Sequence, residues 1–168
     1  ETETTLQLSG KEKFVDLAHN GLSLIGIGAE RTMMLFGVTG EPAVTRAAYR
    51  TASAIAHANR GFSMDYVIGH TWYKSRFTTP YLRNTLWEKG YALDTLETAL
   101  PWSKATAAMQ DIQNTLLHAL DEVNEKVLVF AHLSHMYTDG ASLYITYLFR
   151  QASSPDETLR RWHLMKDA

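Results

Sequence analysis

The fold is decided by residues 126–150, which read KVLVFAHLSHMYTDGASLYITYLFR. Two apolar runs rich in β-branched and aromatic residues, 126–135 and 142–150, flank the turn-forming residues 137–140. Side chains of these types favour strands, and an Asp-Gly pair favours a tight turn between them. The stretch therefore predicts a β-hairpin.

Local signals also predict the elements on either side of the hairpin. Residues 91–99 predict a strand after Gly90, and Pro101 opens a helix with apolar side chains every three or four residues. Ser154, followed by Pro155 and two acidic residues, predicts the start of a last helix. The apolar stripe of the earlier helix consists of Trp102, Ala105, Met109, Ile112, Leu116 and Leu120.

The N-terminal half gives weaker signals. Residues 1–10 predict a frayed polar arm, and residues 11–20 predict a helix that ends at Gly21. The run 31–38 is apolar on both faces, which favours an interior strand. A helix is predicted from Glu41 to about residue 59, because a proline follows at its first position. The side chains that this helix directs inward are Val44, Ala47, Ala48 and Ile55.

Residues 69–88 predict a helix that is interrupted at Pro80, resumes over 82–88 and ends at Gly90. Strands separated by helices and followed by a hairpin predict an α+β fold, in which helices cover an antiparallel or mixed β-sheet. We expect residues 1–168 to form a single domain.

Composition narrows the function classes. The chain is 45% hydrophobic and 20% charged, a balance typical of a soluble globular domain, and we expect a cytoplasmic protein. It has no cysteine, which excludes a disulfide framework, a thiolate zinc site and a cysteine nucleophile. A net charge of -2 gives no basic surface for nucleic acid. The chain starts without Met and stops within a helical pattern, so we expect a piece of a longer protein.

Aromatic and basic side chains alternate between Gly69 and Trp102. Trp72, Trp87 and Trp102 are interleaved here with two arginines, and this composition predicts one wall of a pocket for a flat or anionic ligand. Arg83 lies one helical turn before Trp87. Its guanidinium either binds a carboxylate or phosphate through paired hydrogen bonds, or stacks on the indole of Trp87.

The hairpin carries the other candidate site residues. His132 and His135 have a spacing found in metal sites, but on a strand residues three apart point to opposite faces, which argues against a shared metal ion. His132 and Ser134 share a face and are candidates to line a polar pocket. Tyr144 and Tyr147 fall on opposite faces of the return strand, so one of them faces away from the covered side.

The segment PYLRNTLWEKGYALDTLETALPW, joined to HLSHMYTDGASLYITYLF, resembles the C-terminal cap region of FAD-linked oxidases of the vanillyl-alcohol-oxidase type. The alkylglycerone-phosphate synthase branch is the nearest, and the D-lactate and glycolate dehydrogenase branch is more distant. The resemblance covers most of the chain. It implies a ferredoxin-like cap domain that binds substrate, with FAD held by a separate domain of the same polypeptide whose glycine-rich loops are missing here.

The resemblance also implies roles for individual residues. Arg83 matches an arginine that holds the phosphate or carboxylate of a small anionic substrate, and Tyr144 matches a tyrosine that acts as acid or base near the flavin. Trp87 and His132 are added as substrate-binding candidates. The substrate is either a 2-hydroxy acid or a phosphorylated ketone or alcohol. By itself the chain is expected to bind no FAD and to be inactive, and its uncovered apolar edge is a surface through which two copies could form a homodimer.

A second interpretation is a free-standing α+β module that binds a small molecule or assembles with other proteins without catalysis, because a fold does not fix a function. Convergence of Arg83 and Tyr144 on one cleft would favour the enzyme. A wide separation would favour the module.

Overall fold

The computed structural model describes residue 16 and residues 20–24, 26–28, 31–77 and 81–168. The chain divides into two compact units, Glu1–Phe77 and Thr78–Ala168, called here the N-terminal and C-terminal units. The arm predicted over residues 1–10, most of the helix predicted over 11–20, and the interruption predicted around Pro80 lie outside the described residues. Whether both units act as a single domain stays a prediction.

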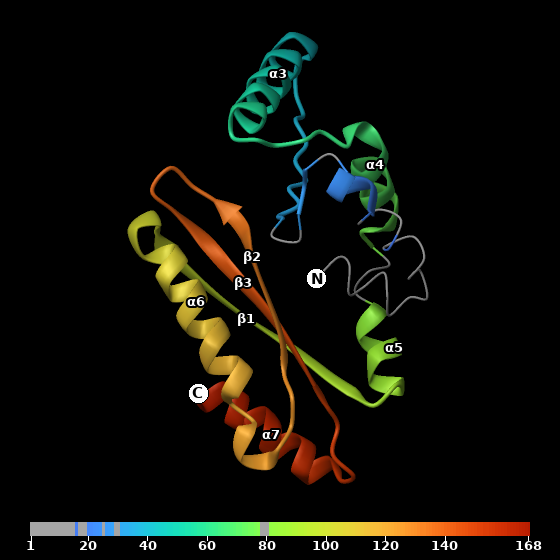
Figure 1. The fold of residues 1–168 in the computed structure, drawn as a ribbon, viewed down its shortest axis with the longest axis vertical. Coiled ribbons are helices and arrows are strands. Elements are labelled where there is room, and N and C mark those ends of the chain that lie inside the picture. The colour runs from blue at the N-terminus through green and yellow to red at the C-terminus, as the bar shows by residue number, and fades with distance from the viewer. Residues whose placement is uncertain (1–15, 17–19, 25, 29–30, 78–80) are drawn as a thin grey trace. The chain divides into compact units, whose positions relative to one another are not determined.

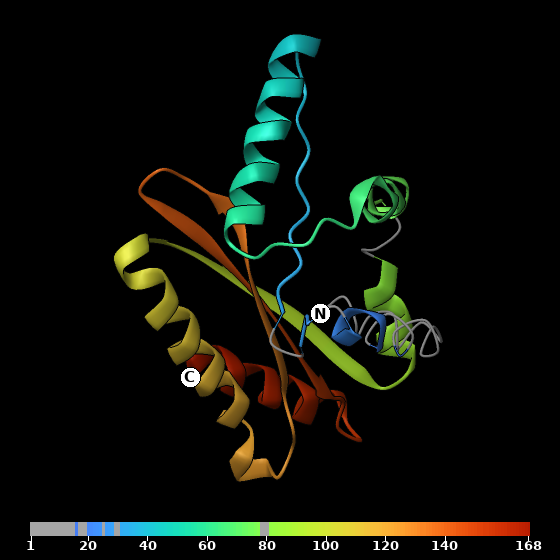
Figure 2. The same cartoon turned by 45° about the horizontal axis from the view of Figure 1, so that its top comes forward.

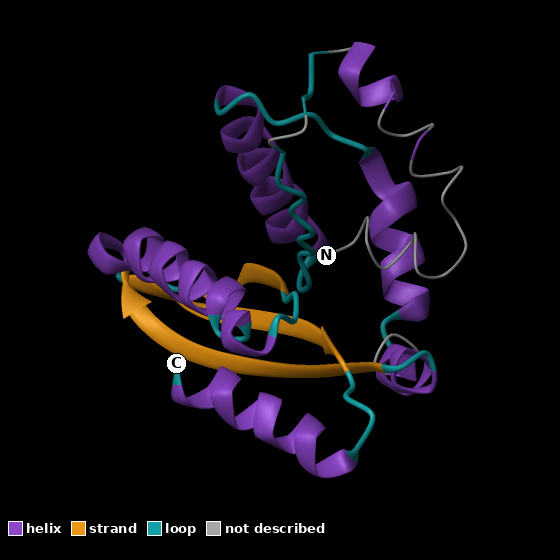
Figure 3. Cartoon of the chain, turned by 60° about the horizontal axis from the view of Figure 1, so that its bottom comes forward, coloured by secondary structure: helices purple, strands orange, loops and turns teal. Residues whose placement is uncertain are grey.

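The described part of the N-terminal unit consists of helices and loops (Figure 3). Helix α3, Pro42–Ala58, has the predicted proline in its first turn and is followed by Asn59 and Gly61, which confirms the predicted helix. Helix α4, Asp65–Ser75, follows. The predicted inward side of α3 is wrong, since Val44 is 64% exposed, Ile55 is 60% exposed and none of the helix's residues is buried.

Two other predictions for this unit are wrong. Residues 31–38 form an extended loop without strand pairing, although the sequence favours a strand. An apolar run becomes a strand only where a neighbouring strand accepts its hydrogen bonds, and here the ring of Phe36 lies against Tyr49 of α3. Gly21 does not end the first helix, because residues 20–24 are helical.

The C-terminal unit is built on a three-stranded antiparallel sheet (Figure 1). Its strands are β1 (Tyr91–Pro101), β2 (Leu128–Met136) and β3 (Gly140–Arg150), in the order β1-β3-β2. The helices are α5 (Leu82–Glu88), α6 (Trp102–His118) and α7 (Pro155–Asp167), with a short 3-10 helix, Asp121–Val123. This arrangement confirms the α+β class, the hairpin and the last three predicted helices.

Both α6 and α7 pack on one face of the sheet. Alternate side chains of β3, namely Ile145, Tyr147 and Phe149, form the core of this face together with apolar side chains from the ends of α6 and α7. The core cluster is Ala92, Leu116, Leu120, Val127, Ile145, Tyr147, Phe149 and Met165. The second face of the sheet, opposite α6 and α7, carries the intervening residues of β3, among them Tyr144.

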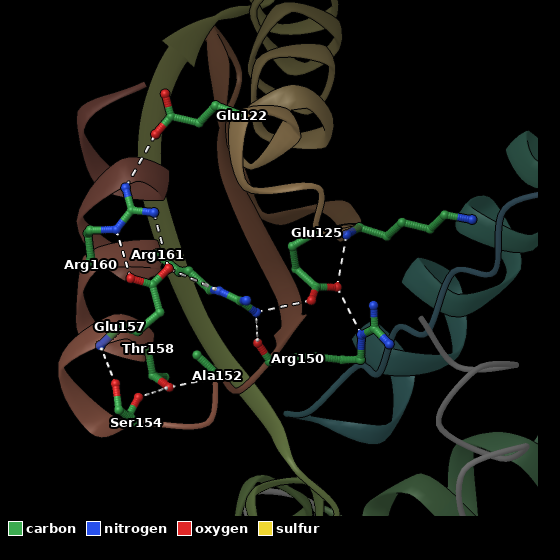
Figure 4. Close-up of polar contacts among 10 residues, drawn as sticks. Glu122, Glu125, Arg150, Ala152, Ser154, Glu157, Thr158, Arg160 and Arg161 are labelled. Carbon is green, nitrogen blue, oxygen red and sulfur yellow. Dashed lines mark hydrogen bonds and ion pairs between the residues drawn. The ribbon is translucent and has the colours of Figure 1, made fainter.

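Polar contacts fix α7 to the sheet. The hydroxyl of Ser154 accepts a hydrogen bond from the Glu157 amide at 3.2 Å, the capping contact predicted from the sequence. Near the start of α7, the buried carboxylate of Glu125 accepts bonds from Arg150 and Arg161, both at 3.0 Å (Figure 4). Burial raises the pKa of Glu125, but the Arg150 hydrogen bond and the other donors outweigh it, so the pKa lies below its ordinary value.

Asp94 of β1 makes the matching contact near the other end of α7. Its Oδ2 accepts hydrogen bonds from the indole of Trp162 at 2.6 Å and the hydroxyl of Tyr147 at 3.3 Å. Lys166 Nζ lies 3.0 Å away. Burial raises the pKa of Asp94, but the bonds from Trp162 and Lys166 and the lysine charge outweigh that effect, and the net pKa is lowered.

Replacing Asp94 with Asn is expected to lower the free energy of unfolding at neutral pH by about 1–3 kcal/mol, since the ionised acceptor is lost. The folded-state pKa lies below the unfolded value, so this contribution is present above about pH 4 and is lost as the pH falls further. Denaturant unfolding from about pH 7 down to about pH 3 should show the two proteins converging at low pH. The exposed Asp111→Asn change on α6 is the control, and an Asp94→Asn deficit independent of pH would contradict this assignment.

Candidate functional site

A β-bulge in β2 brings both hairpin histidines to the second face. His132 pairs with Tyr144, and His135 pairs with Ser142, with a register shift between Leu133 and His135. Ser142 and Tyr144 are two residues apart and share a face, so their partners share it as well. The prediction that the histidines point to opposite faces is therefore wrong, because it assumed an unbroken strand.

Tyr144 lies at the centre of a row of side chains across the three strands. His132 of β2 is its neighbour on one side, and Glu97 of β1 is its register partner on the other. The ring centroids of His132 and Tyr144 are 5.1 Å apart with a tilt of 37°. Directly opposed residues of an antiparallel pair lie side by side, so Tyr144 is flanked by His132 on one side and by Glu97 on the other.

A polar bridge lies beside this row. Ser134 Oγ donates a hydrogen bond of 2.9 Å to Glu97 Oε1, and His135 Nδ1 lies 3.9 Å from the same oxygen. The Ser134 contact confirms that His132 and Ser134 share a face. Glu97 was missed from the sequence, because only the strand register reveals that a residue of β1 meets the hairpin here. No group of three or more metal-ligating side chains is found in the part of the chain that the structure describes.

The two strand tyrosines differ as the alternation predicts. Tyr147 is fully buried in the core, and its pKa is raised by burial and by the charge of Asp94, to which it donates its hydroxyl hydrogen. Tyr144 is partly exposed on the second face. Of the two phenols, Tyr144 is the one that a ligand outside the core can meet.

Arg83 and Trp87 lie on α5, which precedes the start of β1 (Figures 1 and 2). Trp87 is tied to the end of the sheet through its carbonyl oxygen, which accepts a hydrogen bond from Gln151 at 3.1 Å. Tyr144 lies six residues before Arg150 on β3, roughly 20 Å along the strand. Among the described residues, no contact joins Arg83 to Tyr144, so the two do not converge on one cleft there, and this criterion by itself favours the non-catalytic module.

The remaining members of the predicted aromatic wall have separate surroundings. The guanidinium of Arg76, in the N-terminal unit, lies 3.7 Å from the ring centroid of Tyr73 and 4.3 Å from that of Phe77. In the C-terminal unit, the Trp102 indole donates a hydrogen bond of 3.1 Å to the carbonyl of Tyr137. This contact ties the start of α6 to the hairpin turn.

The described residues do not fit the pyrophosphate of FAD. Such a site needs backbone amides at a helix start behind a glycine-rich loop. Gly37 and Gly40 do precede α3. However, the N-cap residue of this helix is Glu41, whose charge repels a phosphate, and its first residue is Pro42, which has no amide hydrogen. The GIG sequence at 26–28 follows a helical segment instead of a strand. We therefore assign no step of flavin chemistry to these residues.

Residues 3–168 match the protein family described as "FAD linked oxidases, C-terminal domain". The chain belongs to this family. An alkyldihydroxyacetonephosphate synthase from Dictyostelium discoideum is 26% identical over 102 residues, which are 61% of this chain and 17% of that protein. The synthase from Trypanosoma brucei brucei is 25% identical over 88 residues, 52% of this chain and 14% of the relative. The chain thus spans a small part of these relatives' length.

Solved structures agree with the fold. Two structures of alkyldihydroxyacetonephosphate synthase superpose with TM-scores of 0.66 and 0.64, each over 76% of this chain and at 24% identity. The superposed part is 24% of one solved chain and 23% of the other. The family match and the α+β fold together confirm the resemblance to FAD-linked oxidases that the sequence predicted. None of the helices in the described ranges has the length and apolar character needed to cross a membrane.

Proposed function

We propose that this chain is the substrate-binding cap of an FAD-dependent enzyme similar to alkyldihydroxyacetonephosphate synthase. The family match spans nearly the whole chain, whereas the chain aligns with only 17% and 14% of the two synthases. Another part of the polypeptide then supplies the FAD-binding domain. Among the anionic substrates considered, a phosphorylated ketone is favoured over a 2-hydroxy acid, because both relatives carry the synthase name.

The observation that carries the proposal is the position of Tyr144. Its phenol stands on the second face of the sheet with His132 beside it, while Tyr147 is sealed in the core. A phenol in this position can give a proton to a substrate oxygen or take one from it. We assign Tyr144 to this proton transfer and His132 to binding the substrate next to it.

Arg83 is proposed to hold the anionic group of the substrate, with Trp87 one helical turn away to contact its apolar part. Arg83 is exposed and has no ion-pair partner among the described residues, so its guanidinium is available for a phosphate. No contact joins Arg83 to Tyr144 among the described residues, and an arginine side chain does not span the roughly 20 Å between Tyr144 and the end of β3 that α5 contacts. The two roles therefore need separate tests.

The Tyr144→Phe change in the full-length enzyme should lower kcat by about 100-fold, in the range expected when an acid–base group is lost, with flavin content and folding unaltered. The assay follows turnover of derivatives of dihydroxyacetone phosphate, the phosphorylated ketone in the relatives' name, with D-lactate and glycolate as the alternative substrates. Tyr137→Phe, which removes a hydroxyl from an exposed tyrosine of the hairpin turn, is the control. Normal turnover by Tyr144→Phe would remove this residue from the mechanism.

The Arg83→Ala change should raise KM for the phosphorylated substrate by roughly 10- to 100-fold, since a charged hydrogen bond to the anion is lost. Flavin content, read from the visible absorption spectrum, should stay at the wild-type level. Arg46→Ala, at an exposed arginine of α3, serves as the matched control. A parallel loss of flavin would mean that Arg83 is structural, and wild-type kinetics in both Arg83→Ala and Tyr144→Phe would favour the non-catalytic module.

A further inference from the structure

We propose that Glu97 is a positioning residue for Tyr144 and that the bridge from Glu97 to Ser134 and His135 holds the phenol in its working orientation. This inference rests on the proposed function, since it presumes that Tyr144 is the acid–base group. It adds Glu97, which neither the motifs nor the family membership assign to the site, and it gives Ser134 and His135 a role in orienting Tyr144.

The bridge spans the central strand. Glu97 belongs to β1 and Ser134 to β2, and β3 lies between them, yet the two side chains are joined by a hydrogen bond of 2.9 Å. Strands in a sheet are about 4.8 Å apart, so the two backbones are separated by about twice that distance. The glutamate side chain must therefore pass over β3 close to the register position of Tyr144.

Two features of the sequence permit this crossing. Ser142, the next residue of β3 on this face, is small and buried, and it leaves room for a longer side chain above it. The bulge after Leu133 turns both Ser134 and His135 toward Glu97, where an unbroken strand would point one of them to the core. One carboxylate oxygen thereby meets a hydroxyl and an imidazole.

The bridge restricts Tyr144 from the side of β1, and the His132 ring restricts it from the side of β2. A phenol flanked on both sides has fewer ring orientations available. Side chains of the bridge are substantially exposed, with 46% for Glu97 and 67% for His135. Exposed contacts of this kind contribute little to stability, so variants of the bridge should fold.

A double-mutant cycle in the full-length enzyme tests the inference, with the dihydroxyacetone phosphate derivative of the preceding assays as substrate. Glu97→Ala should lower kcat about tenfold and leave KM within about twofold, because misorientation affects the reacting group more than binding. Glu97→Gln, which keeps an acceptor for Ser134, should retain most of the activity. In the Tyr144→Phe background, Glu97→Ala should have no further effect, whereas independent residues would give additive losses.

A measurement that needs no turnover separates the two proposals. In full-length protein labelled with 3-fluorotyrosine, the resonance that disappears in Tyr144→Phe belongs to Tyr144. It should shift in Glu97→Ala and in Ser134→Ala and stay unchanged in the Asp111→Asn control. An unshifted resonance in both bridge variants, or additive losses in the cycle, would overturn the positioning role. A shifted resonance combined with normal turnover of Tyr144→Phe would instead contradict the proposed function alone.

Discussion

The pairing of β3 with both of its neighbours is the constraint on which the C-terminal unit depends. The strand is matched to β1 along its whole length and to β2 along most of it, so its backbone is hydrogen-bonded on both sides. This arrangement assigns every side chain of β3 to one of two faces. Ile145, Tyr147 and Phe149 enter the core under α6 and α7, and the alternate positions, among them Tyr144, face the other side of the sheet.

The same pairing creates the candidate site. Glu97 and His132 are 35 residues apart in sequence, yet both lie beside Tyr144, because β3 is placed between their strands. Two other carboxylates, those of Asp94 and Glu125, hold α7 to the opposite face, and their pKa values lie below their ordinary range. Polar groups that stabilise the fold and polar groups available for chemistry are thus separated by the sheet itself.

Sequence reasoning succeeded where the signal was local. The hairpin, the strand after Gly90 and the capped start of α7 follow from adjacent residues, and each is present. It failed where the structure depends on a partner segment. The apolar run 31–38 has no paired strand among the described residues, and the bulge after Leu133 places both histidines on one face instead of on opposite faces. Glu97 could not be found for the same reason, since its role depends on a strand register that spacing does not contain.

The most direct test of the account compares visible absorption spectra of the full-length polypeptide and of this 168-residue chain, each purified in the same way. The account predicts a flavin band in the full-length protein alone, since the residues described here do not form a pyrophosphate site. A full-length protein without flavin would contradict the proposed enzyme. A flavin band in the short chain would contradict the assignment of FAD to another part of the polypeptide.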